Sequence, residues 1–95
     1  MIRNTFILFP DPWPKKKHHK RRLIQENFLS LLRQNTLQDS LIFFRTDHVD
    51  YHDWTIQKFE GSKSWEIIDL PWPFEHESYF QNLLPNYNSI ISRAL

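Results

Sequence analysis

The sequence predicts an α/β fold with a largely parallel sheet, whose last strand can run antiparallel. Short apolar runs of strand length alternate along the chain with longer segments whose apolar residues recur at helical spacing. The strand-like runs are apolar nearly throughout, as is typical of strands in parallel sheets. Ligands bind beyond the carboxyl ends of the strands in such sheets, so polar residues directly after a strand are the first candidates for a site.

The first strand and the first helix are expected on either side of a proline-rich loop. Residues 4–9 (NTFILF) form an apolar run that Pro10 ends. Residues 11–14 predict a stiff loop, because a residue that precedes proline favours extended backbone. A helix is expected to begin within the following basic run and to continue to about Gln34. Its predicted buried face consists of Leu23, Ile24, Phe28, Leu31 and Leu32.

A second strand and helix follow a turn at residues 35–40. Residues 40–46 (SLIFFRT) predict a buried strand, and residues 47–60 predict a helix that Gly61 ends. Asp47 is a candidate cap for this helix, and Asp50 lies near its positive end. The predicted stripe on this helix is Val49, His52, Ile56 and Phe59.

The remaining third of the chain predicts two further strands. Residues 65–69 form the third strand, and a proline-stiffened loop covers residues 70–78. A short helix is expected at residues 79–84 and a last strand at residues 87–93. The side chains of Trp54, Trp65 and Trp72 are expected to pack in the core rather than to stack on bases.

Composition limits the classes of protein that this chain can represent. Its 95 residues, 40% of them hydrophobic, predict one small or partial domain spanning residues 1–95. The chain has no cysteine and no apolar run near the roughly 20 residues of a membrane span, so we expect a cytoplasmic protein without membrane contact. Its one glycine, Gly61, cannot form a glycine-rich loop around a nucleotide-like cofactor. No third ligand is spaced to join the histidines, so no metal site is expected.

The charges are segregated along the chain. Seven basic residues and one acidic residue occur up to Arg22, and five basic and ten acidic residues follow. Six of the basic residues and two histidines occupy positions 15–22, directly after Asp11 and three prolines. A block of this kind is typical either of phosphate-backbone contact or of a solvated face, and charge alone does not separate the two.

The stretch FPDPWPKKKHHKRR (residues 9–22) resembles the signature of the bacterial tRNA (guanine-N7-)-methyltransferase family. FRTDHVDY (residues 44–51) is similar to a later strand of that family, which ends in a Thr-Asp pair. GSKSWEIID, ESYFQNLL and NSII, within residues 61–91, are similar to its carboxyl-terminal tail. The resemblance covers only the second half of the family's domain. It implies the carboxyl-terminal half of a Rossmann-like fold that uses S-adenosylmethionine, with most of the cofactor pocket absent from this chain.

The resemblance also implies roles for individual residues. Asp11 matches the active-site aspartate, and Asp11 with Pro12 is expected at the edge of the cofactor site. The residues expected to bind tRNA are Lys15, His18, Arg21, Arg22, Asp47 and Ser78. Gln81 stands where the family usually has glutamate.

The chemistry of guanine N7 fits these assignments. N7 carries a lone pair, so its methylation needs alignment with the sulfonium methyl group rather than a strong base. The carboxylate of Asp11 can accept hydrogen bonds from guanine N1–H and the N2 amino group, and it can stabilise the positive charge that develops on the ring. Trp13 can line the pocket or stack on a base.

Three states of the chain remain open on these grounds. It can pair with a separate amino-terminal methyltransferase half, be a truncated remnant of the enzyme, or be an RNA-binding module without catalysis. In each case we expect the isolated chain to be inactive, with sheet edges and an apolar face uncovered.

Overall fold

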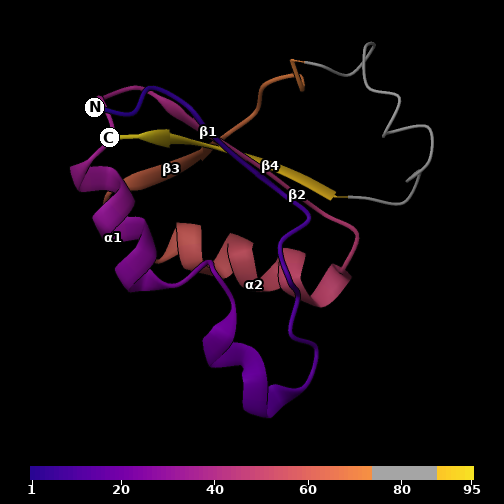
Figure 1. Ribbon diagram of the computed structural model, residues 1–95. Helices are drawn as coiled ribbons and strands as arrows, with labels where there is room; N and C mark the ends of the chain where they lie inside the picture. The colour runs from indigo at the N-terminus through magenta and orange to yellow at the C-terminus, as the bar shows by residue number, and fades with distance from the viewer. Residues whose placement is uncertain (74–87) are drawn as a thin grey trace.

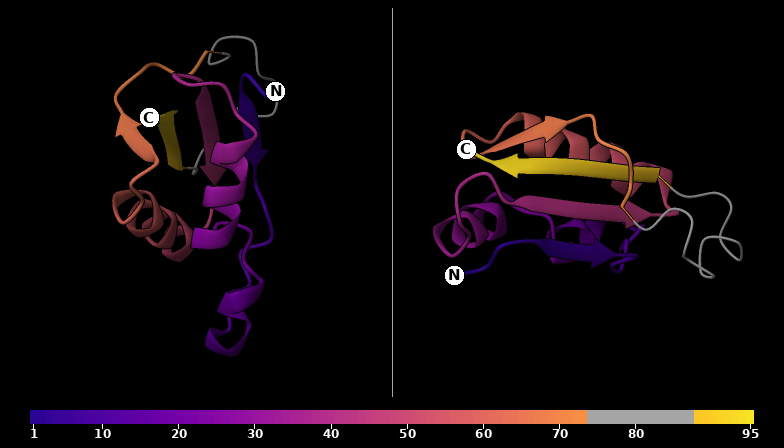
Figure 2. Two further views of the ribbon diagram at one scale, coloured as in Figure 1. Left: turned by 90° about the vertical axis from the view of Figure 1, so that its left-hand side faces the viewer. Right: turned by 90° about the horizontal axis from the view of Figure 1, so that it is seen from above.

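The described part of the chain forms a four-stranded sheet with two α-helices on one face (Figure 1; Figure 2). The computed structural model describes residues 1–73 and 88–95. Ser78, Gln81 and the expected helix at residues 79–84 lie outside the described residues. The elements are β1 (Thr5–Leu8), the 3₁₀ helix η1 (Lys16–Arg21), α1 (Glu26–Gln34), β2 (Leu41–Thr46), α2 (Val49–Glu60), β3 (Trp65–Ile68) and β4 (Asn88–Ala94).

The sheet is mixed, with strand order β1-β2-β4-β3. β1 pairs with β2 in parallel, whereas β4 is antiparallel to both of its neighbours, β2 and β3. The four expected strands are therefore present and the last one is antiparallel. The prediction of a largely parallel sheet is right in one respect, because β1, β2 and β3 all run in the same direction. It is wrong for the pairings, because β4 lies between β2 and β3 and is antiparallel to both.

The main core lies between the sheet and the two α-helices. Alternate residues of each strand face this side, because side chains along a strand point to opposite faces in turn. Trp65 anchors the core, since its ring is buried and its indole Nε1 donates a hydrogen bond to the carbonyl of Leu29 at 2.9 Å. The buried core residues are Ile7, Ile24, Leu29, Leu32, Ile42, Phe44, Tyr51, Phe59, Trp65, Ile90 and Ala94.

A smaller apolar cluster covers the opposite face of the sheet. Phe43, Trp72 and Ile91 form it, with the chain after β3 folded over the strands. Phe6 stacks on Phe43 with ring centroids 4.7 Å apart. Trp65 and Trp72 are buried as expected, and Trp54 packs against the main core in a partly buried position.

The prediction of a single helix from the basic run to Gln34 is wrong. η1 ends at Arg21, Arg22 has extended backbone (φ −61°, ψ 140°), and α1 begins only after Gln25. At this break the side chain of Arg22 is buried and contacts the Pro12 carbonyl and the Asp50 carboxylate. The predicted face is correspondingly only partly right, since Leu23 and Leu31 are exposed whereas Ile24 and Leu32 are buried.

The expected second helix is present, but its cap and buried face differ from the prediction. His48 caps α2, since its Nδ1 accepts a hydrogen bond from the Tyr51 amide at 3.1 Å, so Asp47 is not the cap. The buried residues of α2 are Tyr51, Thr55 and Phe59 rather than a stripe that begins at Val49. The apolar pattern misled here because two of the buried residues are polar and have hydrogen-bond partners. The Thr55 hydroxyl donates to the Tyr51 carbonyl one turn earlier, and the Tyr51 hydroxyl accepts from the distant Ile24 amide.

Candidate functional site

The two predicted site carboxylates, Asp11 and Asp47, follow the carboxyl ends of two adjacent strands. β1 and β2 are parallel neighbours, with Leu8 opposite Arg45 and the Phe9 amide donating to the Arg45 carbonyl at 2.8 Å. Asp11 lies shortly after β1 and Asp47 directly after β2. Both residues are exposed, and among the described residues neither carboxylate forms a hydrogen bond or an ion pair. The carboxyl edge of the sheet therefore presents two carboxylates that are available to a ligand.

Backbone strain flanks Asp11 on both sides. Phe9 has φ 53° and Trp13 has φ 42°, a left-handed region that residues with a bulky side chain rarely adopt. Each such residue costs on the order of 1–3 kcal/mol and persists only when its surroundings hold it. The prolines at positions 10, 12 and 14 further restrict the backbone conformations open to this loop, because the ring of each proline fixes the φ angle of that residue. The loop that carries Asp11 is thus a constrained turn.

Two of the predicted tRNA-binding residues, His18 and Arg21, contact the ring of Trp13. The His18 ring meets the Trp13 ring edge-on with centroids 5.7 Å apart. The Arg21 guanidinium lies 5.2 Å from the centroid of the same ring. Arg21 is nevertheless exposed, so this cation–π contact leaves the residue open to solvent. Asp11 and this cluster belong to one continuous surface segment, residues 11–21.

The basic run divides into outward and inward side chains. Two residues of the run, His19 and Arg22, turn toward α2. The His19 ring meets the Trp54 ring edge-on at 5.5 Å, and its Nε2 is 3.3 Å from the Pro14 carbonyl. The exposed residues are Lys15, Lys16, Lys17, Lys20 and Arg21.

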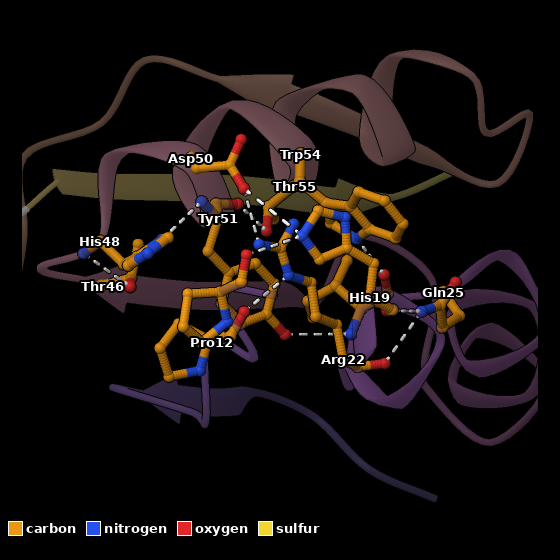
Figure 3. A network of polar contacts seen from close by, with 12 residues as sticks. Pro12, His19, Arg22, Gln25, Thr46, His48, Asp50, Tyr51, Trp54 and Thr55 are labelled. Carbon is orange, nitrogen blue, oxygen red and sulfur yellow. Dashed lines mark hydrogen bonds and ion pairs between the residues drawn. The ribbon is translucent and has the colours of Figure 1, made fainter. Parts of the chain in front are cut away.

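Arg22 is the predicted tRNA-binding residue whose position differs most from expectation. Its side chain is fully buried, with Nε donating to the Pro12 carbonyl and Nη2 to Asp50, each at 2.7 Å (Figure 3). The side chain presents no surface to a phosphate in this structure. The hydrogen bond from Arg22 is the main reason that the pKa of Asp50 is lowered, against the opposing effect of desolvation.

Sequence reasoning missed the aromatic residues around Arg22. Tyr51 and Trp54 lie on the face of α2 that receives it, and Asp50 was noted only for its place near the helix start. The signal was faint: an acidic residue and two aromatic residues within five positions of a helix next to a strongly basic segment. Burial raises the pKa of the Tyr51 phenol, whose oxygen accepts a hydrogen bond from the Ile24 amide at 3.2 Å.

The described residues fit only the margin of a cofactor site. Gly61 ends α2 with an ordinary right-handed conformation (φ −79°, ψ −7°) and does not follow a strand, so it does not form a cofactor loop. The carbonyl of Pro12 accepts a hydrogen bond from Arg22 Nε, which occupies one of the two acceptor positions of that oxygen. In residues 1–73 and 88–95 no cluster of three or more histidine or carboxylate side chains could hold a metal ion.

The described part of the chain contains no helix that is long and apolar enough to cross a membrane.

Comparisons with known proteins agree with one another. The profile of the Methyltransf_4 family of methyltransferases matches residues 1–86. A tRNA (guanine-N(7)-)-methyltransferase of Wolbachia pipientis is 55% identical over 53 residues, which are 56% of this chain and 24% of that protein.

Two further relatives carry the same name. The protein of Halorhodospira halophila is 45% identical over 63% of this chain and 26% of its own length. The protein of Lachnoclostridium phytofermentans is 32% identical over 96% of this chain and 42% of its own length. The chain thus spans about a quarter to two fifths of the curated relatives that it matches.

Proposed function

This chain belongs to the tRNA (guanine-N7-)-methyltransferase family, and on that premise we propose that it forms the tRNA-binding, carboxyl-terminal half of a Rossmann-like enzyme that methylates guanine N7 in tRNA. The observation that carries the proposal is the arrangement at the carboxyl edge of the sheet. Asp11 stands exposed on a constrained loop, Asp47 follows the adjacent parallel strand, and exposed cations continue from the same loop.

The reaction assigns a distinct task to each part of this edge. Asp11 binds the guanine by accepting hydrogen bonds from N1–H and the N2 amino group, which selects guanine against adenine and counters the charge that forms on the ring. Asp47 contacts the substrate from the neighbouring strand end. Lys15, Arg21 and their exposed neighbours bind phosphates, and His18 sits beside Arg21 on the Trp13 ring.

S-adenosylmethionine would supply the methyl group as an electrophile, and most of its pocket would come from residues outside this chain. This chain would contribute Asp11 and Pro12 at the margin of that pocket. β1 lies at one end of the strand order, and Leu8 on it is about half exposed. A sheet edge of this kind is suited to pairing with the strands of an amino-terminal half, whether that half belongs to the same polypeptide or to a separate one.

Methyl transfer to unmodified tRNA tests the proposal directly. The chain is assayed with radiolabelled S-adenosylmethionine, alone and joined to the part of the Lachnoclostridium phytofermentans relative outside the matched region. We expect transfer only in the joined protein, and we expect Asp11→Asn to abolish it. Asp39→Asn is the matched control, because Asp39 is an exposed carboxylate before β2, at the opposite edge of the sheet. Activity that survives Asp11→Asn would contradict the catalytic role of Asp11.

RNA binding without catalysis is the second candidate, and the exposed cations of residues 15–21 favour it because they do not depend on the missing cofactor residues. A chain of this kind would bind tRNA by itself and would do so equally well after Asp11→Asn. No transfer by the joined protein, together with retained tRNA binding, would select this candidate. Loss of both activities would indicate a remnant of the enzyme.

A further inference from the structure

Arg22 is the buried member of an otherwise exposed basic segment. Its whole side chain is inaccessible, whereas the neighbouring Arg21 is exposed. Arginine is almost never fully buried unless it is paired. Arg22 is paired twice through different nitrogens, Nε to the Pro12 carbonyl and Nη2 to Asp50 Oδ2, both at 2.7 Å (Figure 3). These contacts join Arg22 to the loop ten residues before it and to α2, 28 residues after it.

Two aromatic rings enclose the same guanidinium. Its central carbon lies 5.0 Å from the centroid of Tyr51 and 4.9 Å from that of Trp54. Among the described residues Nη1 has no hydrogen-bond acceptor, so the ring faces provide its electrostatic compensation. The planar guanidinium meets a carbonyl, a carboxylate and two rings at once. A lysine ammonium, which is compact and cannot stack in this way, would not reproduce that set of contacts.

The loop that these contacts hold is the one that carries Asp11. Pro12 directly follows Asp11 and lies between the two strained residues Phe9 and Trp13. Asp50 lies in the first turn of α2, which begins shortly after Asp47. Arg22 therefore links the loop after β1 to the helix after β2, and so links the surroundings of both site carboxylates.

We propose that Arg22 is a positioning residue, which holds the Asp11 loop against α2 through Pro12 and Asp50 and does not itself bind tRNA. This inference rests on the proposed function for its catalytic consequence. Its structural part, that Arg22 orders the loop, stands independently of it. The basic run then has two tasks, with Arg22 holding the Asp11 loop and the exposed cations binding phosphates.

Arg22→Met tests the role, because methionine keeps much of the apolar stem and removes every donor. In the joined protein described above, we expect kcat for methyl transfer to fall at least tenfold while the Kd for tRNA changes less than twofold. In the 95-residue chain, we expect the {¹H}–¹⁵N heteronuclear NOE of the Asp11 and Trp13 amides to decrease, since the loop gains fast motion. Lys63→Met is the control, since Lys63 is an exposed lysine that precedes β3 at the opposite edge of the sheet.

Asp50→Asn is the second variant, and it guards against a folding defect in Arg22→Met. The Asp50 side chain is 62% exposed, so its replacement should leave the fold intact. We expect the same changes in kcat and NOE to a smaller degree, and Asp50→Glu should restore much of both. A role limited to overall stability would not produce this rescue together with an unchanged tRNA affinity.

The outcomes separate the two ideas. Unchanged NOE values in both variants would overturn the positioning role, as would a weaker tRNA affinity with a reduced salt dependence in Arg22→Met. Absence of transfer by the unmutated joined protein would refute the proposed function alone. The NOE comparison would then still decide whether Arg22 holds the loop.

Discussion

The division of the basic run into outward and inward side chains predicts a specific salt dependence of tRNA binding. Five cations of this segment are exposed, at Lys15, Lys16, Lys17, Lys20 and Arg21, whereas Arg22 is buried. Each phosphate that a cation neutralises contributes about 0.7–0.9 to the slope of log K against log salt, through counterion release. If all five exposed cations contact phosphates, the slope is about −3.5 to −4.5.

The size of the effect makes it readily measurable. Raising the salt from 50 mM to 200 mM should weaken tRNA binding by roughly 130- to 500-fold at that slope. Lys17→Gln should reduce the magnitude of the slope by about 0.7–0.9, and replacing all five exposed cations with glutamine should remove most of it. Lys63→Gln should leave the slope unchanged, because Lys63 lies at the opposite edge of the sheet.

Fluorescence anisotropy of end-labelled tRNA, measured at five or more salt concentrations, gives the slopes for each variant. The fold of each variant is checked by circular dichroism. We expect unchanged spectra, because the replaced side chains are exposed. A slope that stays the same after all five replacements would show that the tRNA contacts another surface. A slope that falls equally for Lys17→Gln and Lys63→Gln would show that only total charge matters.

Three further predictions concern the contacts that support the site. Tyr51→Phe removes the acceptor of the buried Ile24 amide and should lower the free energy of unfolding by about 1–3 kcal/mol, measured by urea denaturation; no change would mean that this hydrogen bond contributes nothing net. Trp65→Ala should cost about 3–5 kcal/mol in the same assay, and a loss below 1 kcal/mol would contradict the placement of Trp65 in the core. The pKa of Asp50 is lowered below its ordinary value of 3.8, chiefly by the hydrogen bond from Arg22, so its contribution to stability is present above pH 3.8 and lost as the pH falls through its folded pKa. The stability difference between the unmutated chain and Asp50→Asn should therefore shrink as the pH falls below about 3.8 and persist at pH 6, and a difference independent of pH would refute the pairing.

Much of the fold followed from local sequence because the strands carry strong local signals. The runs that became β1 and β2 are short, apolar and end at a proline or a polar pair, which favours strands over helices. The helix limits were predicted less well. The segment around Arg22 has good helix formers on both sides, yet Arg22 itself has extended backbone and its side chain is paired with Pro12 and Asp50.

The candidate site, like the fold, could be predicted from the sequence only in part. Asp11, the prolines and the basic residues lie close together in the sequence, so a carboxylate beside a basic segment could be read directly from it. The roles expected for these residues came from the family resemblance. The adjacency of Asp47 depended on β1 and β2 being parallel neighbours, which the structure confirms. Ser78 lies outside the described residues, and its role stays a prediction.

By itself, the sequence indicated the family and the four strands, and it predicted a chemistry for the site, because these depend on residue types at short spacing. Only the tertiary structure decided which cations of the basic run face outward. Eight consecutive charged or ionisable side chains look equivalent along the chain. They differ only once α2 presents a carboxylate and two aromatic rings to Arg22, since burial of a cation is favourable only where partners from distant segments meet it.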